Sequence, residues 1–81
     1  IEAETVAKLA EHKNIVGIKN SSENVRQTTE MIDQTPKEFA TIIGTASVLY
    51  SSLSAGAVGG ILALANIAPN ECVQIQKLVE E

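Results

Sequence analysis

The sequence is poor in aromatic residues and in cysteine. Its 81 residues include one tyrosine, one phenylalanine, no tryptophan and a single cysteine, Cys72. Because 44% of the residues are hydrophobic, a core has to be built from closely packed Ala, Val, Ile and Leu. One cysteine cannot form an internal disulfide or a cysteine cluster around a metal. This fits a reducing compartment, and we expect a cytoplasmic protein.

Positive charge is scarce as well. Ten acidic residues outnumber six lysines and arginines, so the formal net charge is −4, and no two basic residues are adjacent apart from His12-Lys13. The chain therefore lacks the basic surface that nucleic acids and anionic membranes attract. No apolar run reaches the roughly 18 residues of a membrane-spanning helix, and no basic segment precedes an apolar signal core. We expect neither nucleic acid nor membrane as a partner.

Short apolar runs alternate with amphipathic segments along the chain. The runs over residues 15–18, 39–43 and 58–64 predict strands that are covered on both faces. Helical spacing predicts helices over residues 1–11, from Ser21 or Ser22 to Thr35, over 46–55, and from Pro69 onward. Their expected inward residues are Val25, Thr29 and Ile32, then Val48, Leu49 and Leu53, and finally Cys72, Ile75 and Val79. Gly56 is placed for a left-handed C-cap of the third helix.

The spacing of the strands predicts an α/β fold. Strand starts near residues 15, 39 and 58 are too far apart for hairpins and indicate right-handed βαβ crossovers in a parallel sheet. Three parallel strands leave both edges open and cannot close a barrel, which needs about eight. We therefore interpret residues 1–81 as a single partial domain of a longer protein.

One lysine stands where the first expected strand ends, in the run Ile15-Val16-Gly17-Ile18-Lys19-Asn20-Ser21-Ser22. Functional residues of parallel α/β folds gather at the carboxyl ends of strands, where we also expect Gly44-Thr45 and Asn66. An amine at the mouth of an apolar pocket is poorly solvated and can act as a neutral nucleophile. A solvated surface lysine is the ordinary alternative.

The glycines and Asn66 also have plain structural explanations. Gly44 would allow a close approach of backbone or substrate, or simply form a turn. Gly56, Gly59 and Gly60 do not have the G-x-G-x-x-G spacing of a phosphate-binding loop, which favours a tight turn and close packing. Asn66 is expected as a loop residue that bonds to its own backbone more readily than as a ligand.

The remaining reactive side chains favour structural roles. His12 has no partner histidine or cysteine nearby and is expected to be solvated. Cys72 is expected as a small buried hydrophobe, and Tyr50 as a packing residue of its helix. Ser21 and Ser22 are better placed to cap a helix than to act as nucleophiles, because no histidine is placed to activate them.

Three segments resemble the dihydrodipicolinate synthase and N-acetylneuraminate lyase family. The segment Val16-Gly17-Ile18-Lys19-Asn20-Ser21-Ser22 is similar to the strand that carries the Schiff-base lysine of this family. Ile42-Ile43-Gly44-Thr45-Ala46 resembles the seventh strand and its glycine turn, and Gly56-Ala57-Val58-Gly59-Gly60-Ile61 with Leu64-Ala65-Asn66 resembles the eighth. The resemblance implies a fragment, about strands 6 to 8, of a (β/α)₈ TIM barrel, and a homotetramer at full length.

The resemblance implies a pyruvate-dependent aldolase or lyase of class I, which works through a lysine Schiff base. Lys19 would attack the keto carbon of pyruvate, and the protonated imine would stabilise the carbanion that adds to an aldehyde. Backbone groups at Gly44 and Ile61 would bind the substrate. No metal or organic cofactor is implied, because the imine itself is the electron sink.

Several activities within the family fit the sequence. The leading one is that of 4-hydroxy-tetrahydrodipicolinate synthase, an enzyme of lysine biosynthesis. The alternative is a 4-hydroxy-2-oxoglutarate aldolase or another 2-keto acid aldolase of the family. The segment Ala63-Leu64-Ala65-Asn66 resembles the eighth-strand region of the former. Asn20 and Glu23 stand where the family often has an acidic residue and a glycine, which leaves the second substrate open.

Part of the machinery that the resemblance implies lies outside these residues. The carboxylate-binding threonines and the proton-relay tyrosine of the family belong to earlier strands, so no residue of this chain, Tyr50 included, takes those roles. An alternative to an enzymatic function is therefore that the isolated 81 residues are a structural piece of a barrel without catalytic activity.

Overall fold

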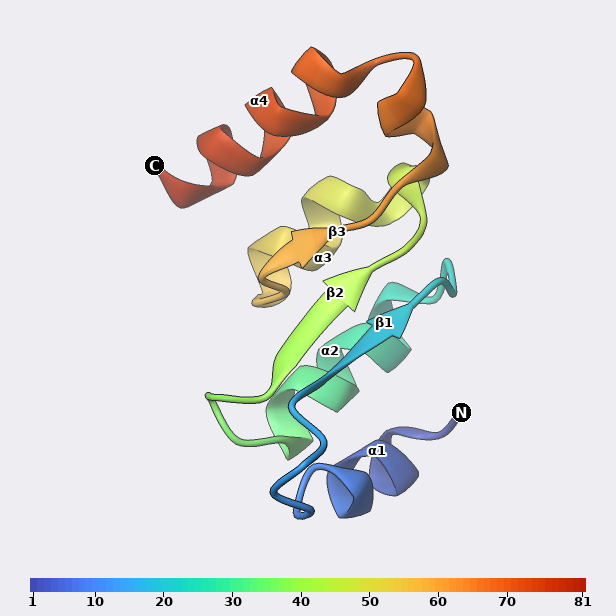
Figure 1. Ribbon diagram of the computed structural model, residues 1–81, viewed down its shortest axis with the longest axis vertical. Helices are drawn as coiled ribbons and strands as arrows, with labels where there is room; N and C mark the ends of the chain where they lie inside the picture. The colour runs from blue at the N-terminus through green and yellow to red at the C-terminus, as the bar shows by residue number, and fades with distance from the viewer.

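The computed structural model describes all 81 residues as alternating helices and strands. The elements are α1 (Ala3–Leu9), β1 (Gly17–Asn20), α2 (Val25–Gln34), β2 (Ala40–Ile43), η1 (Ala46–Val48), α3 (Leu49–Ala55), β3 (Gly59–Gly60), η2 (Ala63–Asn66) and α4 (Pro69–Glu80), where η marks a 3₁₀ helix. The strands are parallel and lie in the order β1-β2-β3 (Figure 1). The predicted α/β fold with a parallel sheet is confirmed. None of the helices has the length and apolar character that crossing a membrane requires.

Helices α2 and α3 lie on one face of the sheet, and no helix lies on the other (Figure 1). Ile43 is fully buried against α3, so the side chains that alternate with it point to the helix-free face. That face carries Lys19 of β1 and its register partner Ile42 of β2. Gly60 is the register partner of Ile43, and Ile61 follows it directly. Ile61 therefore points to the helix-free face, as Lys19 does, and it is 60% exposed. Within this chain the expectation of strands covered on both faces is therefore wrong.

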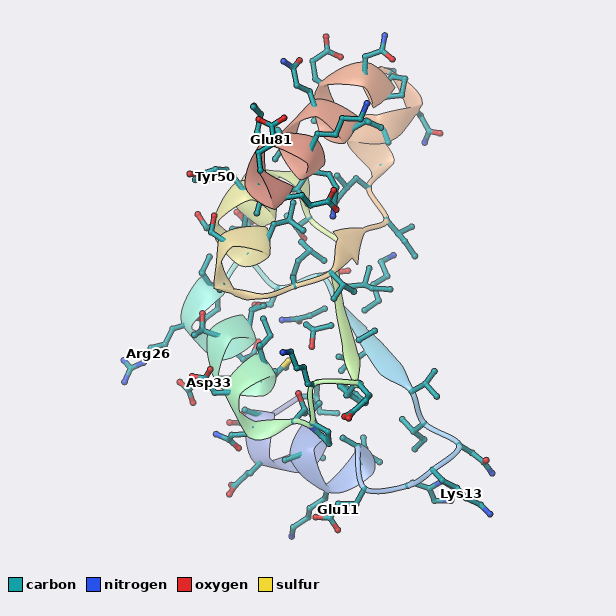
Figure 2. The ribbon with its side chains drawn as sticks, turned by 90° about the vertical axis from the view of Figure 1, so that its left-hand side faces the viewer. Glu11, Lys13, Arg26, Asp33, Tyr50 and Glu81 are labelled. Atoms are coloured by element: carbon teal, nitrogen blue, oxygen red, sulfur yellow. The ribbon has the colours of Figure 1, made fainter.

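The core consists of two hydrophobic clusters on the covered side. One cluster contains Ala3, Val6, Met31 and Phe39, and the other contains Ile43, Leu49, Leu53 and Ala57. Ile75 and Val79 of α4 pack against the second cluster and Cys72 is buried, which confirms the expected stripe of this helix. Tyr50, however, is 64% exposed and points away from the sheet (Figure 2), so the expectation that it packs inside is wrong. Helix α3 buries Leu49, the residue before Tyr50, instead.

Strand β1 lies two residues further along the chain than the predicted 15–18. Its ladder with β2 runs from the carbonyl of Val16, which accepts the N–H of Ala40, to the carbonyl of Asn20, which accepts the N–H of Gly44, both at 2.9 Å. Backbone pairing with β2 therefore holds polar residues in the strand, although their side chains have low strand propensity.

Strand β3 is much shorter than the predicted 58–64. The N–H of Ile61 donates to the carbonyl of Ile43 at 2.9 Å, and there β2 ends. The residues that follow have no strand to pair with, so the chain forms η2, in which the N–H of Ala65 donates to the carbonyl of Leu62 at 3.1 Å. Strand length is thus limited by the partner strand and not by the apolar run.

Helix α2 is capped by Asn24, whose side chain accepts the N–H of Gln27 at 3.1 Å. The prediction of a serine cap is therefore wrong. The buried residues of the helix are Thr28 and Met31, while the predicted Thr29 is only partly buried. The predicted Ile32 does pack inward, against the cluster that contains Ile43. Asparagine at the cap with glutamine three residues later is a recognised start signal that the sequence does contain.

Gly56 ends α3 with a φ of 121°, the one positive φ in the chain, as expected for this C-cap. A Cβ at this position would lie 3.1 Å from Cγ2 of Ile32 in a conformation that L-residues rarely adopt. We expect Gly56→Ala to lower the free energy of unfolding by about 1 to 3 kcal/mol, measured by urea denaturation. Gly59→Ala, whose added Cβ would meet no atom within 4 Å, is the matched control. Equal stability of the two variants would contradict this explanation of Gly56.

Candidate active site

Lys19 lies one residue before the end of β1, and its side chain is exposed on the helix-free face of the sheet. Its register partner is Ile42 of β2. It takes part in no salt bridge and no hydrogen bond of its side chain; the one ion pair of the chain joins Arg26 to Glu30 on the outer side of α2 (Figure 2). The lysine is therefore free to react with a ligand on the helix-free face.

Gly44 follows β2 and lies directly beside Lys19. A Cβ on Gly44 would be 2.6 Å from Cε of Lys19 and 3.2 Å from Cβ of Ser21, and closer still to the Ser21 hydroxyl. The φ of Gly44 is not positive, so a turn conformation does not require glycine here. The plain turn therefore does not explain this glycine. Its close neighbours are the side chains of Ser21 and Lys19, and not the backbone or substrate that the sequence analysis named.

The other two expected site residues differ in their placement. Ile61 lies on the same face as Lys19, and no backbone or side-chain donor of the chain reaches the carbonyl oxygen of either Gly44 or Ile61. These two oxygens are thus available to a ligand. Asn66 ends η2, is exposed and makes no side-chain hydrogen bond, so neither its expected bond to its own backbone nor a link to Lys19 is present.

The loops after β1 and β2 are joined to each other beside the lysine. The hydroxyl of Thr45 donates to the carbonyl of Ser21, and the hydroxyl of Ser47 donates to a carboxylate oxygen of Glu23 at 3.2 Å. Ser22 accepts the N–H of Asn24 at 3.0 Å and so orders the turn before α2. Glu23 therefore holds the loops together on the rim of the site, a role that its sequence position did not predict.

Asn20 points away from Lys19, into the layer between the sheet and α2. Only 8% of its surface is exposed, and its side-chain amide donates to the hydroxyl of Thr28 at 2.9 Å. Sequence reasoning connected Asn20 with substrate choice and missed this contact. The alternation of strand residues places it opposite the lysine, but its partner depends on how α2 packs.

The chain does not enclose the lysine. Its four surface hollows measure about 230 to 420 Å³, and none is lined by Lys19, Gly44 or Ile61. The apolar pocket expected around the amine is therefore not formed by these residues, because the helix-free face of the sheet has no cover within the chain. No three His, Cys, Asp or Glu side chains come together as a metal site requires. His12 is exposed, and its ring accepts the N–H of Asn14 at 3.1 Å.

Most of the chain is similar in sequence or in structure to known synthases and aldolases. It is 36% identical to 4-hydroxy-tetrahydrodipicolinate synthase 2 of Clostridium acetobutylicum over 75 residues. These residues cover 93% of this chain and 26% of that protein. A dihydrodipicolinate synthase family protein from Coccidioides immitis superposes with a TM-score of 0.87 at 27% identity, over 99% of this chain and 27% of that one. The 2-keto 3-deoxygluconate aldolase of Picrophilus torridus gives a TM-score of 0.75 at 28% identity, over 95% and 33%.

The chain spans about a quarter of the length of the curated relative it matches. The match to the family model nevertheless extends over residues 1–81 and so includes all three strands. The chain belongs to the dihydrodipicolinate synthetase family.

Proposed function

We propose that the full-length protein is a class I aldolase or lyase in which Lys19 forms an imine with pyruvate, and that its activity is that of 4-hydroxy-tetrahydrodipicolinate synthase. One observation carries the proposal. In a chain of this family, an exposed lysine lies on the open face of the sheet against a glycine that leaves room for it. A relative of this chain carries the name 4-hydroxy-tetrahydrodipicolinate synthase 2, which supports the choice of activity.

The proposal includes the place of the chain in a larger fold. Residues 1–81 are a single partial domain that supplies about strands 6 to 8 of a (β/α)₈ barrel. The other strands pair with the free edges of β1 and β3 and close the barrel over the helix-free face, which removes water from around Lys19. The assembled protein is a cytoplasmic homotetramer. The open face and the unpaired edges of the sheet support the barrel. The tetramer rests on the family resemblance alone, and the compartment on the single cysteine.

The chemistry follows from the position of the amine. The neutral amine of Lys19 attacks the keto carbon of pyruvate, and loss of water gives an imine. The protonated imine withdraws electrons, and a base outside residues 1–81 takes a methyl proton. The enamine carbon then attacks the aldehyde carbon, the aldehyde oxygen takes up a proton from that base, and hydrolysis of the imine frees the lysine. The free carbonyl oxygens of Gly44 and Ile61 accept hydrogen bonds from donors of the intermediates, such as the hydroxyl of the carbinolamine that precedes the imine. No step requires a metal or an organic cofactor.

Imine formation can be tested by trapping. The full-length protein is incubated with pyruvate, reduced with borohydride and digested, and the modified peptide is mapped by mass spectrometry. We expect a single adduct on the peptide that contains Lys19, and none when pyruvate is omitted. An adduct confined to any other lysine, or no adduct at all, would rule out the mechanism.

A second activity within the family has its own support. The likeness to a 2-keto 3-deoxygluconate aldolase favours a 2-keto acid aldolase, such as a 4-hydroxy-2-oxoglutarate aldolase, as the alternative. Both activities share the lysine imine and differ in the partner of pyruvate. Turnover of pyruvate with aspartate semialdehyde, compared with cleavage of 4-hydroxy-2-oxoglutarate, separates them. For the isolated 81 residues we propose a structural role only, since their lysine lies outside any hollow.

A further inference from the structure

Asn20 is a polar residue held in the buried layer between β1 and α2, directly after Lys19. Its amide nitrogen donates to the hydroxyl of Thr28 at 2.9 Å, and its amide oxygen accepts the N–H of Ser22 at 3.3 Å. Its backbone carbonyl accepts the N–H of Gly44 at 2.9 Å. The residue beside the lysine is thus bonded to α2, to its own loop and to the residue that follows β2.

The partner on α2 is itself fixed. Thr28 is fully buried, and its hydroxyl donates to the carbonyl of Asn24, the cap of α2, at 3.4 Å. A series of hydrogen bonds therefore runs from the end of β1 to the first turn of α2. The bond between Asn20 and Thr28 is buried, and such a bond is specific in geometry, because an amide without its partner in such a layer is unfavourable.

We propose that Asn20 is a positioning residue for Lys19, and that its hydrogen bond to Thr28 holds the end of β1 in the rotation that lays the lysine side chain against Gly44. Neighbouring strand residues point to opposite faces, so an anchor on the helix side sets the direction of the amine on the other side. This inference rests on the proposed imine chemistry. A misplacement of about 1 Å in a reacting group can slow a reaction by about 10²-fold.

The test compares two substitutions of Thr28 in the full-length protein. Thr28→Val keeps the shape and removes the hydroxyl, whereas Thr28→Ser keeps the hydroxyl and removes a methyl group. We expect Thr28→Val to slow imine formation at saturating pyruvate by about 10- to 100-fold, as measured by quenching with borohydride at successive times. Thr28→Ser is expected to stay within about threefold of the natural protein, although it loses packing.

Further variants complete the design. Asn20→Leu removes the amide from the other side and is expected to slow imine formation as much as Thr28→Val, with little further loss in the double variant, because both remove one interaction. Thr29→Val is the matched control, since the hydroxyl of Thr29 donates only to Val25 within α2, at 2.9 Å. Circular dichroism and thermal unfolding of each variant show whether it is folded at the assay temperature. Should Asn20→Leu not fold, the pair of Thr28 variants decides.

The possible outcomes are distinct. If the natural protein gives no pyruvate adduct, the proposed function fails before the inference is tested. If the natural protein is trapped and Thr28→Val is trapped at the same rate, then Asn20 serves the fold alone and the inference is overturned. It is also overturned if Thr28→Ser is slowed more than Thr28→Val, because packing and not the hydrogen bond would then control the lysine.

Discussion

Replacing Lys19 with alanine in the full-length protein is expected to abolish turnover of pyruvate and to lower kcat by more than about 10³-fold. The amine is the nucleophile of the proposed reaction, and removing the nucleophile of a covalent mechanism typically costs several orders of magnitude. The side chain is exposed and takes part in no ion pair or hydrogen bond of the chain. The free energy of unfolding should therefore change by no more than about 0.5 kcal/mol.

A second substitution separates charge from nucleophilicity. Lys19→Arg keeps a positive charge, but the guanidinium stays protonated in proteins and cannot attack a carbonyl, so this variant should be as inactive as the alanine variant. Lys37→Ala is the matched control, because Lys37 is also exposed but lies at the amino end of β2, opposite the site. Steady-state kinetics and borohydride trapping provide the measurement. Turnover of the alanine variant at a tenth of the natural rate would contradict the assignment.

The features that the sequence could predict are those set by local patterns. The three apolar runs and their spacing are enough to predict a parallel sheet, and the position of Lys19 near the end of its run places it near the carboxyl end of β1. The C-cap at Gly56 and the buried stripe of α4 also follow from local rules, because a left-handed cap and a helical period of 3.6 residues depend on few neighbours.

The features that could not be predicted depend on packing between distant segments. The length of β3 is limited by the end of β2, and the rotation of α2 is set by the cluster in which Met31 meets α1. The contact of Asn20 with Thr28 forms only after α2 has packed on the sheet. The pocket expected around Lys19 is absent for a related reason, because these residues do not form its walls. An apolar run in the sequence does not show which other segments cover the strand that it forms.

Gly44→Ala should produce the second large effect, a loss of activity with little loss of stability. The added Cβ would lie 2.6 Å from Cε of Lys19 and closer still to the hydroxyl of Ser21, so both side chains have to turn away. The Ser21 hydroxyl and Cε of Lys19 can rotate away, and Cβ of Ser21, at 3.2 Å, has to shift only slightly. The backbone of Gly44 has no positive φ, so the free energy of unfolding should fall by less than about 1 kcal/mol. The lysine, however, leaves the position from which it reacts, and imine formation should slow by about 10²-fold.

Gly59→Ala provides the control, because Gly59 is the register partner of Ile42 in the same sheet and an added Cβ there would meet no atom within 4 Å. Both variants add one methyl group at the sheet, but only one adds it beside the lysine. Imine formation measured by timed borohydride quenching should therefore separate them, while urea denaturation should not. If both variants react at the natural rate, Lys19 can reach pyruvate from another rotamer, and the contact with Gly44 is not the one that the reaction uses.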